Sequence, residues 1–564
     1  MSIAELKRVA REKLYADEGL GCGNFLFKAH ALSPTPTVPF LFLERPFVAP
    51  SGNAFREFSL NTLYNVVRSL AECYASLGVR KGDVVATMFE NGVGYFIHYL
   101  ALNSLGAAIA ILNAKVPAEV AAQYLKQNGF KVLVFDSRTD NTNVFRTISM
   151  LDRSTGLHEI SVAELGGQSG TVLADWPVAS QPDDTVMICH SSGTTNIPKA
   201  IVYTHRQHFI GKRERLNQFI EQPDDRMFTA MPPAHSAGIS YLMTAVMCEV
   251  PTFVPSTLVG PTMADHVLQF RPTIMTGFAQ TWTSLADPDF LYPGAFSFVR
   301  RFYNTGDTPH EKHVTKLLRL APKARFTDGY GSSELAMAQF EKISTANNVA
   351  SKRCVGRPRW FVEDVKIVDA CGQQVPDNEV GYIVIKSPTL TPGYYNQPQL
   401  TQLARLDGYW ITGDVGYKSG EEYYQVDRSY DMVTTASGPL YSLATEEFVL
   451  QEVSGIHDAV VGGVNRFPLN VQSTVAIIVA ETGKTVAAGT VLDKLRSLEQ
   501  FDRDLPSFSL CAAITTCGDA VPVGCTGKVL KRTLRDTFWD TYRAYLAGDR
   551  RVYSEVLWNE DRRD

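Results

Sequence analysis

The sequence predicts an α/β protein with a large N-terminal domain, made of sheets flanked by helices plus a β-rich subdomain, and a small C-terminal α/β domain. The chain has 564 residues, too many for one hydrophobic core, so at least two domains are expected. Helical and apolar strand-like segments alternate from residue 60 to residue 260, which is typical of a sheet with helices on its faces. The pattern becomes strand-rich near residues 377–387, and a short α/β pattern follows residue 427. We therefore place the two domains at residues 1–427 and 428–564.

The individual elements are predicted from hydrophobic periodicity and from the residues that interrupt it. In the large domain we expect helices at Leu60–Leu77, Tyr95–Leu105 and Ala118–Asn128, and strands at Val84–Met88, Ala107–Leu112, Lys131–Phe135, Thr185–Cys189, Ala200–Tyr203 and Gly381–Lys386. In the small domain we expect helices at Thr445–Val453 and Val491–Leu498, with a strand at Ala459–Val461. Aromatic residues at helical spacing predict one more helix, Asp536–Ala547, packed on the small domain.

Composition and charge disfavour several classes of protein. Apolar residues make up 45% of the chain and charged residues 20%, as in ordinary globular domains. The net charge of −5 argues against nucleic acid and anionic membrane as partners, because both attract basic surfaces. None of the nine cysteines forms a CxxC pair, so no structural zinc site is expected. The N-terminus lacks the apolar core of a signal peptide, and no run approaches the roughly 20 apolar residues that span a bilayer. We expect a cytoplasmic protein with no membrane segment, whose cysteines are free and mostly buried.

A loop rich in hydrogen-bond donors carries the strongest functional signal. Residues 190–199 read His-Ser-Ser-Gly-Thr-Thr-Asn-Ile-Pro-Lys and lie between two predicted strands. Four hydroxyls and a lysine can bind phosphate oxygens, and Gly193 allows the backbone to approach them closely. Pro198 and Ala200 flank the lysine, so this is not the GxxxxGK[ST] loop of P-loop kinases. A polar surface turn is the alternative when the segment is considered alone.

This loop resembles the phosphate-binding motif of the adenylate-forming superfamily, which includes acyl-CoA synthetases, adenylation domains of non-ribosomal peptide synthetases, and luciferases. The family motif reads [ST]-[ST]-G-[ST]-T-G-x-P-K, and residues 191–199 match it except at Asn196. The resemblance extends from about Leu60 to Arg532. It implies ATP and Mg²⁺ as cofactors and a mobile C-terminal lid domain. It also implies that Thr194 is catalytic and that the phosphates are bound by Ser191, Ser192, Gly193, Thr194, Thr195 and Lys199.

Three further motifs follow in the order of the family. Residues 328–334, Asp-Gly-Tyr-Gly-Ser-Ser-Glu, resemble Y-G-x-[ST]-E. The resemblance implies that Tyr330 lies against adenine, that Ser333 contacts the α-phosphate or the substrate carboxylate, and that Glu334 is catalytic and binds Mg²⁺, which prefers oxygen ligands. Residues 409–414 resemble [YW]-x-T-G-D, so Asp414 would accept both ribose hydroxyls, and Arg428 resembles the ribose-binding arginine. Residues 304–309 occupy the place of the adenine-side loop. Outside the phosphate loop, the implied nucleotide-binding residues are Gly306, Asp307, Thr308, Asp328, Gly329, Tyr330, Gly331, Ser333, Asp414, Arg428 and Lys528.

The resemblance implies a catalytic lysine and a substrate pocket. Residues 522–532 resemble P-x-T-x-x-G-K-x-x-[RK], so Lys528 would reach the substrate carboxylate and the α-phosphate. Charge develops there as pyrophosphate leaves, and a fixed ammonium group stabilises it. Residues 231–238 resemble the element before the acyl pocket, where His235 would act as a catalytic gate for the carboxylate; a structural histidine is the equal alternative. The pocket would lie between His235 and Tyr330 and include Gly277 and Phe278.

The hinge region departs from the family pattern. Tyr430 stands where the family has its hinge aspartate, Thr434 replaces a lysine, and the P-x-E-[IV]-E element becomes Leu443–Glu447. Asp307 also stands where a small residue or a carboxamide is usual. In the family the hinge lines the route of the thiol acceptor. We therefore expect ATP-dependent acyl-adenylate formation, with coenzyme A as the leading acceptor. The alternatives are transfer to an amine or to a separate carrier protein, activation of a non-carboxylate oxyanion, and a non-catalytic nucleotide-binding role.

Overall fold

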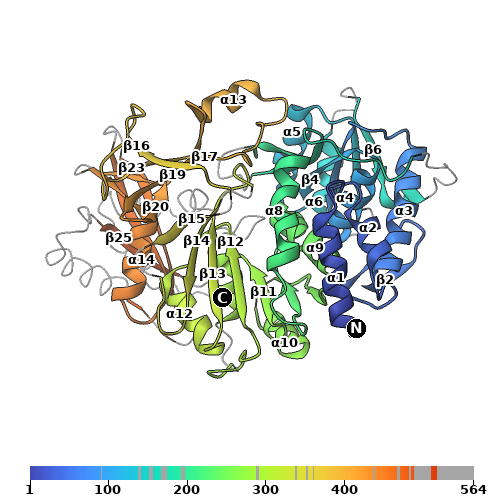
Figure 1. The fold of residues 1–564 in the computed structure, drawn as a ribbon. Helices are drawn as coiled ribbons and strands as arrows, with labels where there is room; N and C mark the ends of the chain where they lie inside the picture. The colour runs from blue at the N-terminus through green and yellow to red at the C-terminus, as the bar shows by residue number, and fades with distance from the viewer. Residues whose placement is uncertain are drawn as a thin grey trace, which may run out of the picture.

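The computed structural model describes residues 1–90, 92–136, 142–151, 156–166, 175–191, 197–258, 260–286, 291–336, 339–350, 353–359, 361–435, 438–466, 471–481, 484, 486–487 and 510–516. The chain starts with helix α1 (Ile3–Ala16), whose first turn is closed by a capping box between Ser2 and Glu5. Helix α2 (Phe25–Leu32) follows, and both helices pack near α8 (His205–Gln218) and α9 (Ser236–Cys248). Figure 1 shows α8 and α9 in the centre of the molecule, between two sheets.

The first sheet has the strand order β6-β5-β3-β4-β7-β8 and is parallel except at β8. Successive residues of its strands face opposite sides. Val85 and Ile109 pack in the cluster that contains α3 and α4, whereas Ala86 and Ala110 pack with α5 and α6. Helices therefore cover both faces, which explains the continuous apolar strands. The elements are α3 (Leu60–Ser76), β3 (Val84–Phe89), α4 (Gly94–Ser104), β4 (Ala108–Asn113), α5 (Ala118–Asn128), β5 (Val132–Phe135), α6 (Thr142–Met150), β6 (His158–Ser161), α7 (Val162–Gly166), β7 (Thr185–His190) and β8 (Ala200–Thr204).

The second sheet joins a parallel half to an antiparallel half. Strands β1, β10, β9, β11, β12 and β13 run parallel to one another, β2 is antiparallel at one edge, and β14, β15, β20, β19, β17 and β16 continue antiparallel from β13. Its strands are β1 (Leu41–Val48), β2 (Ala54–Phe58), β9 (Met227–Thr229), β10 (Thr252–Val254), β11 (Ile274–Gly277), β12 (Arg301–Thr305), β13 (Arg325–Tyr330), β14 (Gln339–Ser344), β15 (Cys354–Arg359), β16 (Asp364–Val368), β17 (Gly381–Lys386), β18 (Arg405–Leu406), β19 (Tyr409–Ser419) and β20 (Glu422–Arg428). The remaining helices of this region are α10 (Pro261–Phe270), α11 (Ala279–Leu285), α12 (Glu311–Leu320) and α13 (Pro398–Leu403).

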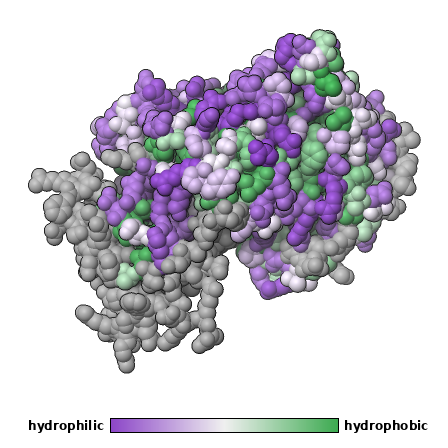
Figure 2. Space-filling model, turned by 90° about the horizontal axis from the view of Figure 1, so that it is seen from below, coloured by the Kyte–Doolittle hydropathy of each residue, from purple (hydrophilic) through white to green (hydrophobic). Residues whose placement is uncertain are grey.

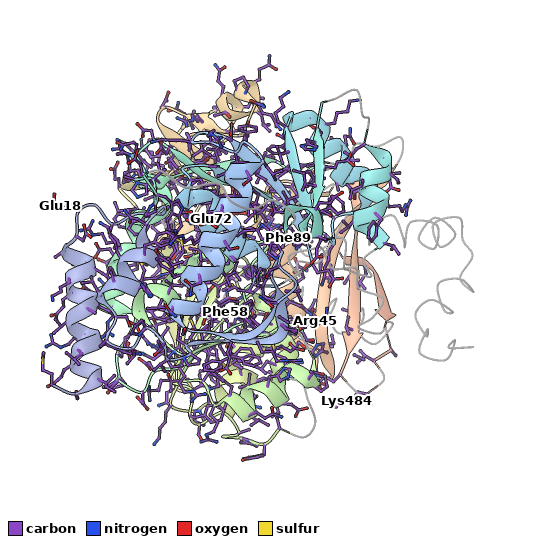
Figure 3. The ribbon with its side chains drawn as sticks, turned by 90° about the vertical axis from the view of Figure 1, so that its right-hand side faces the viewer. Glu18, Arg45, Phe58, Glu72, Phe89 and Lys484 are labelled. Carbon is purple, nitrogen blue, oxygen red and sulfur yellow. The ribbon has the colours of Figure 1, made fainter. Side chains whose placement is uncertain are left out.

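The region after Arg428 has a hydrophobic cluster of its own, which includes Val433, Val449, Val461 and Ile478. It contains the pair β21 (Val433–Thr435) and β22 (Gly438–Leu440), helix α14 (Ser442–Glu452), and a sheet of β23 (Ile456–Arg466), β24 (Val471–Ala480) and β25 (Leu510–Thr516). Figure 3 places Glu18, just after α1, at one side of the molecule and β23–β25 at the other.

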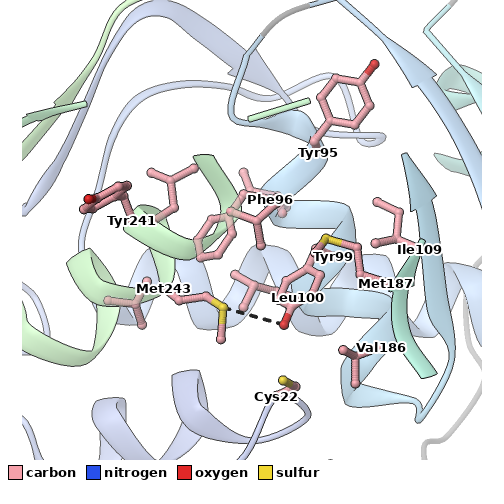
Figure 4. Close-up of a cluster of buried hydrophobic side chains, with 14 of the residues drawn as sticks. Cys22, Tyr95, Phe96, Tyr99, Leu100, Ile109, Val186, Met187, Tyr241 and Met243 are labelled. Atoms are coloured by element: carbon pink, nitrogen blue, oxygen red, sulfur yellow. Dashed lines mark hydrogen bonds between the residues drawn. The ribbon is translucent and has the colours of Figure 1, made fainter. Parts of the chain in front are cut away.

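The core between the two sheets combines aliphatic, aromatic and sulfur-containing side chains. Figure 4 shows Met243 of α9 pointing toward Tyr99 of α4, whose hydroxyl lies 3.7 Å from the Met243 sulfur. The free cysteines include Cys22, Cys73, Cys189, Cys248, Cys354 and Cys371, and all of these but Cys371 are buried, as the sequence predicts. In the view of Figure 2, hydrophilic residues cover most of the coloured surface, and hydrophobic residues form small separate groups. None of the helices described by the structure is long and apolar enough to cross a membrane.

The α/β prediction is confirmed, and most predicted elements lie within one or two residues of the observed ones. The helix predicted at Ala118–Asn128 coincides with α5, which ends at Gly129 in the left-handed conformation that glycine tolerates. The predicted helix Thr445–Val453 begins three residues late, because α14 starts at Ser442. The helices predicted at Val491–Leu498 and Asp536–Ala547 lie outside the described residues.

Candidate active site

A cavity of about 840 Å³ lies at the carboxyl ends of strands from both sheets. Strands β11, β12 and β13 end at Gly277, Thr305 and Tyr330, and β7 of the other sheet ends at His190. Open α/β sheets bind ligands at this edge, because the loops after parallel strands converge there. The cavity is lined by twelve of the residues singled out in the sequence: Ser191, Lys199, His235, Phe278, Gly306, Gly329, Tyr330, Gly331, Ser333, Glu334, Asp414 and Arg428.

One wall of the cavity holds a lysine and a carboxylate on either side of a tyrosine hydroxyl. The backbone N–H of Ser191 donates to the Lys199 carbonyl (2.9 Å), and the Lys199 N–H donates to Ser191 Oγ (2.9 Å). Lys199 Nζ donates to Tyr394 Oη at 3.3 Å, and Tyr394 in turn donates to Glu334 Oε1 at 3.1 Å. Burial and the Glu334 carboxylate raise the pKa of Tyr394, so its hydroxyl stays a donor. This wall can bind an anion beside Lys199 and a cation beside Glu334.

A second wall combines a carboxylate, a guanidinium group and a phenol. Asp414 and Arg428 face each other across the antiparallel strands β19 and β20. Tyr330 donates its hydroxyl to Asp414 Oδ2 at 2.7 Å, and the Asp414 N–H donates to Thr412 Oγ1 at 3.1 Å. Burial and the nearby Asp414 raise the pKa of Tyr330. The wall therefore offers a fixed carboxylate and fixed donors, which suit a vicinal diol such as ribose.

Hydrogen bonds from Asn304, near the end of β12, hold the loop that follows this strand. The Nδ2 atom of this asparagine donates to the Asp307 carbonyl (2.8 Å) and to Asp328 Oδ1 (2.6 Å), and its Oδ1 accepts from Trp282 Nε1 (2.8 Å). Burial raises the pKa of Asp328 to about 6, against the lowering effect of the hydrogen bond from Asn304. Asp328 thus lies beneath the cavity surface and supports the loop. Gly306 lines the cavity with φ +95°, whereas Asp307 and Thr308 line a smaller cavity alongside.

His235 begins helix α9 and also forms part of the cavity wall. Its Nδ1 accepts from the Ala237 N–H at 3.1 Å, so it caps the helix. Its ring meets Phe278 edge-on, with ring centroids 5.2 Å apart. Gly277 lies beside them, where a Cβ atom would come within 3.0 Å of Trp282. Glycine at this position lets α11 pack close to β11, and Phe278 rather than Gly277 lines the cavity.

Five predicted residues, Ser192, Gly193, Thr194, Thr195 and Lys528, lie outside the described residues, and their roles stay predictions. Within the described ranges, no group of three His, Cys, Asp or Glu side chains could hold a metal ion. The donor set nevertheless fits Mg²⁺ bound to a nucleotide, because that ion usually takes only one or two carboxylates and completes its shell with phosphate oxygens and water. Glu334 is placed to supply such a carboxylate.

The structure adds residues that sequence reasoning missed. Tyr394 links Lys199 to Glu334 although it lies 195 residues from the first and 60 from the second. His208, Lys212 and Arg215 also line the cavity. Their spacing of four and three residues puts them on one face of α8. That spacing was the only sequence feature that could have indicated a shared face, but charged helix faces usually point to solvent.

Comparisons with known proteins identify the family of this chain. The family model described as AMP-binding enzyme matches residues 43–395. A 3-aminoavenalumate diazotase from Streptomyces sp is 30% identical over 94% of this chain and 98% of its own length. A 2-succinylbenzoate–CoA ligase from Geobacillus sp. (strain WCH70) is 26% identical over 76% of this chain and 85% of its own length.

Solved structures share the fold. ATP-bound MatB from Rhodopseudomonas palustris superposes with a TM-score of 0.76 at 19% identity, over 92% of this chain and 99% of that chain. O-succinylbenzoate coenzyme A synthetase (MenE) from Bacillus subtilis, in complex with ATP and magnesium ion, superposes with a TM-score of 0.72 at 21% identity, over 92% of this chain and 100% of that chain.

Proposed function

Because the chain belongs to the AMP-binding enzyme family, we propose that it uses ATP to convert an acid oxyanion into its adenylate, with release of pyrophosphate. One observation carries the proposal: Ser191, Lys199 and Glu334 line the same cavity as Asp414 and Arg428. ATP carries groups in the same arrangement, because its triphosphate is a polyanion at one end and its ribose diol lies further along the molecule. The acyl-adenylate of a carboxylic acid is the product we favour for the first step.

The chemistry of this step needs positive charge around the phosphates. An oxygen of the acid attacks the α-phosphorus, the bond to the pyrophosphate oxygen breaks, and the negative charge moves onto pyrophosphate. Lys199 would stabilise that charge from the base of the phosphate loop, and Lys528 is proposed to do so at the attacking carboxylate. Mg²⁺ would be held by Glu334 and the phosphates, where it neutralises charge. Ser333 would hold the α-phosphate or the acid.

The remaining residues orient the nucleotide. Asp414 would accept the ribose hydroxyls, with Arg428 beside it and Tyr330 fixing the carboxylate. Gly306, Asp307, Thr308, Gly329 and Gly331 would border adenine. We further propose that residues 428–564 act as the mobile lid that carries Lys528, hinged next to Tyr430 on the domain of residues 1–427. Free cysteines fit a reducing cytoplasm as the place of work.

Coenzyme A is the leading acceptor for the second step. Relatives named as ligases of 2-succinylbenzoate and of crotonobetaine or carnitine with CoA support it, at 26% and 25% identity. The thiolate of coenzyme A would attack the acyl carbon and expel AMP, giving a thioester. A separate carrier protein with a thiol would react in the same way.

A second candidate function is favoured by the relative named as a diazotase, which shares 30% identity over 94% of this chain. In this scheme the oxyanion is nitrite. Nitrite oxygen attacks the α-phosphorus and pyrophosphate leaves; an aromatic amine then attacks the nitrosyl nitrogen and expels AMP and a proton. The N-nitroso product tautomerises and loses hydroxide, which leaves a diazonium ion. Adenylation is common to both schemes, and only the oxyanion and the nucleophile differ.

The decisive experiment is ATP–pyrophosphate exchange with a broad panel of carboxylic acids and, separately, with nitrite. Exchange with an organic acid supports acyl-adenylate formation, and exchange with nitrite alone supports the second candidate. Mass spectrometry of products formed with coenzyme A, with an aromatic amine, or with no acceptor then identifies the second step. Absence of exchange with every acid and with nitrite would refute adenylate formation.

A further inference from the structure

The far wall of the cavity carries buried basic side chains. Lys212 is 3% exposed and His208 is fully buried. Lys212 Nζ lies 3.3 Å from His208 Nδ1, and Arg215 Nη1 donates to Ser240 Oγ (2.9 Å) and Thr244 Oγ1 (3.1 Å). In the part of the chain that the structure describes, neither Lys212 nor Arg215 forms an ion pair with a carboxylate.

Such an arrangement destabilises the folded protein unless an anion binds next to the basic side chains. An ammonium group taken out of water destabilises the folded state when no opposite charge accompanies it. The neighbouring Arg215 adds repulsion, and burial together with Arg215 lowers the pKa of Lys212 to about 7. Among the residues that the structure describes, His208 Nε2 has no hydrogen-bond partner. Lys212 and His208 are both among the residues that line the cavity.

Aromatic rings surround these basic groups. The Arg215 guanidinium lies 4.4 Å from the ring centroid of Tyr241, and Phe219 and Tyr303 stack at 6.0 Å. Tyr241 leaves α9 on the side opposite Met243, as Figure 4 shows, so it faces away from the Tyr99 core and lines the cavity. Flat aromatic walls around a cationic end suit a conjugated or aromatic molecule that terminates in an anion.

The end of the cavity that carries the basic side chains adjoins the end where the reaction is proposed to occur. The rings of Tyr203 and His208 lie 5.4 Å apart, edge to face. The Tyr203 hydroxyl lies 3.1 Å from Ser236 Oγ and also contacts Ser333, next to Glu334. One molecule can therefore place its reacting group near Ser333 and its opposite end at Lys212.

We propose, on the premise of the adenylation function above, that the organic substrate carries a carboxylate at the end opposite its reacting group, and that Lys212 and Arg215 bind it. In the coenzyme A scheme this substrate is a dicarboxylic acid. In the nitrite scheme it is an aromatic amine that bears a carboxylate. Both schemes place a planar carboxylate group at this site. The alternative is that the site binds a free small anion, and the test distinguishes the two.

The inference also predicts how substrate preference depends on pH. The groups that face Lys212 are Arg215 and His208 on α8, Cys22 before α2, and Cys189 on β7. Burial raises the pKa of Cys22 to about 12 and raises that of Cys189, and burial with Lys212 holds the pKa of His208 well below its usual value. Lys212 is therefore the group that changes charge near neutrality. Preference for a distal anion should fall above pH 7, by up to tenfold per unit, as Lys212 loses its proton.

The test compares substrates that differ only in the distal charge. In the acid arm, terephthalate, 4-carboxycinnamate and aliphatic dicarboxylates are compared with their monoamides by pyrophosphate exchange. In the nitrite arm, 3-aminobenzoate and 3-aminocinnamate are compared with the corresponding amides by product formation. Each pair is measured from pH 6 to 9 with the wild type, with Lys212→Met, which keeps the side-chain volume, and with Arg206→Met, an exposed basic residue in the first turn of α8, as the matched control.

The wild type should prefer the distally anionic member of at least one pair. Lys212→Met should lower that preference by about 30-fold, as expected for the loss of a charge-assisted contact, and should remove its pH dependence, while Arg206→Met keeps both. Activity of Lys212→Met toward the amide shows that the variant is folded. Equal use of both members by the wild type would overturn the inference while leaving adenylation intact. So would a rise in the use of the amide to the level of the acid when free acetate is added, because the site would then bind a small anion and not the substrate. Failure of the wild type with every substrate would instead count against the proposed function.

Discussion

Asp328 should make the stability of the protein depend on pH in a direction opposite to that of most carboxylates. Burial raises its pKa from an ordinary value of 3.8 to about 6. Below about pH 4 the group is protonated in both the folded and the unfolded chain, so it has no effect on stability. As pH rises toward 6 the unfolded chain releases the proton more readily, and the folded state loses relative stability. A difference of about 2 pKa units corresponds to about 3 kcal/mol.

The perturbation is Asp328→Asn, which removes the titration and keeps a carbonyl oxygen for the hydrogen bond from Asn304. Relative to the wild type, this variant should gain about 3 kcal/mol of unfolding free energy between pH 4 and pH 7. Urea unfolding followed by tryptophan fluorescence at several pH values measures this gain. Asp183→Asn, at a carboxylate whose side chain is 90% exposed, serves as the control and should show no such trend. A difference between Asp328→Asn and the wild type that stays constant across this range would refute the reasoning.

Four further variants test the proposed site and the lid. Asp414→Ala should raise the KM for ATP about 30-fold or more through lost hydrogen bonds to ribose, and an unchanged ATP dependence would remove Asp414 from the site. Tyr394→Phe should lower the rate of pyrophosphate exchange about 10-fold, because Lys199 and Glu334 lose the hydroxyl between them; equal rates would show that the hydroxyl does not position them. Lys528→Ala should nearly abolish adenylation but spare acyl transfer from a supplied adenylate, and equal loss of both steps would contradict a moving lid. Glu447→Gln should speed hydrogen exchange in α14, because the Glu447 carboxylate accepts the 2.8 Å contact from His310 that ties α14 to the loop before α12; unchanged exchange would mean that packing alone holds the helix.

The sequence predicts the elements of the first sheet well because their signals are local. Strand β4 is an apolar run that ends at Asn113, and α5 is an amphipathic helix closed by Gly129, so neighbouring residues determine both. The motif residues around Tyr330 and Asp414 could be found for the same reason. What the sequence could not give is contact between distant segments. Nothing near Tyr394 indicates that its hydroxyl lies between Lys199 and Glu334.

The basic face of α8 shows a second limit of sequence reasoning. His208, Lys212 and Arg215 follow a helical spacing, but the same pattern is typical of a solvent-exposed face. Only the packing of α8 between two sheets turns that face toward a cavity (Figure 1). Arg213 and Glu214, on the same helix, instead contact Tyr15 of α1. Charge alone therefore does not distinguish the residues of α8 that line the cavity from the other charged residues of this helix.

Two of the departures from the family pattern, one at the hinge and one in the adenine-side loop, meet at one side chain. Arg428 Nη1 donates to the Tyr430 hydroxyl at 2.9 Å, and Nη2 pairs with the Asp307 carboxylate. Asp307 stands where the family usually has a small residue or a carboxamide, and Tyr430 stands where it has the hinge aspartate. An aspartate at 430 would be a short anionic partner for Arg428; here the anionic partner comes from residue 307, on the loop after β12, and residue 430 contributes a neutral hydroxyl.

The substitutions thus compensate for each other: the arginine proposed to bind ribose keeps its charge partner, but that partner belongs to the adenine-side loop instead of the hinge. A turn of the chain at Tyr430 would then break a neutral hydrogen bond and leave the ion pair between Arg428, which precedes that residue, and Asp307 intact. The altered hinge is therefore compatible with a lid that still moves.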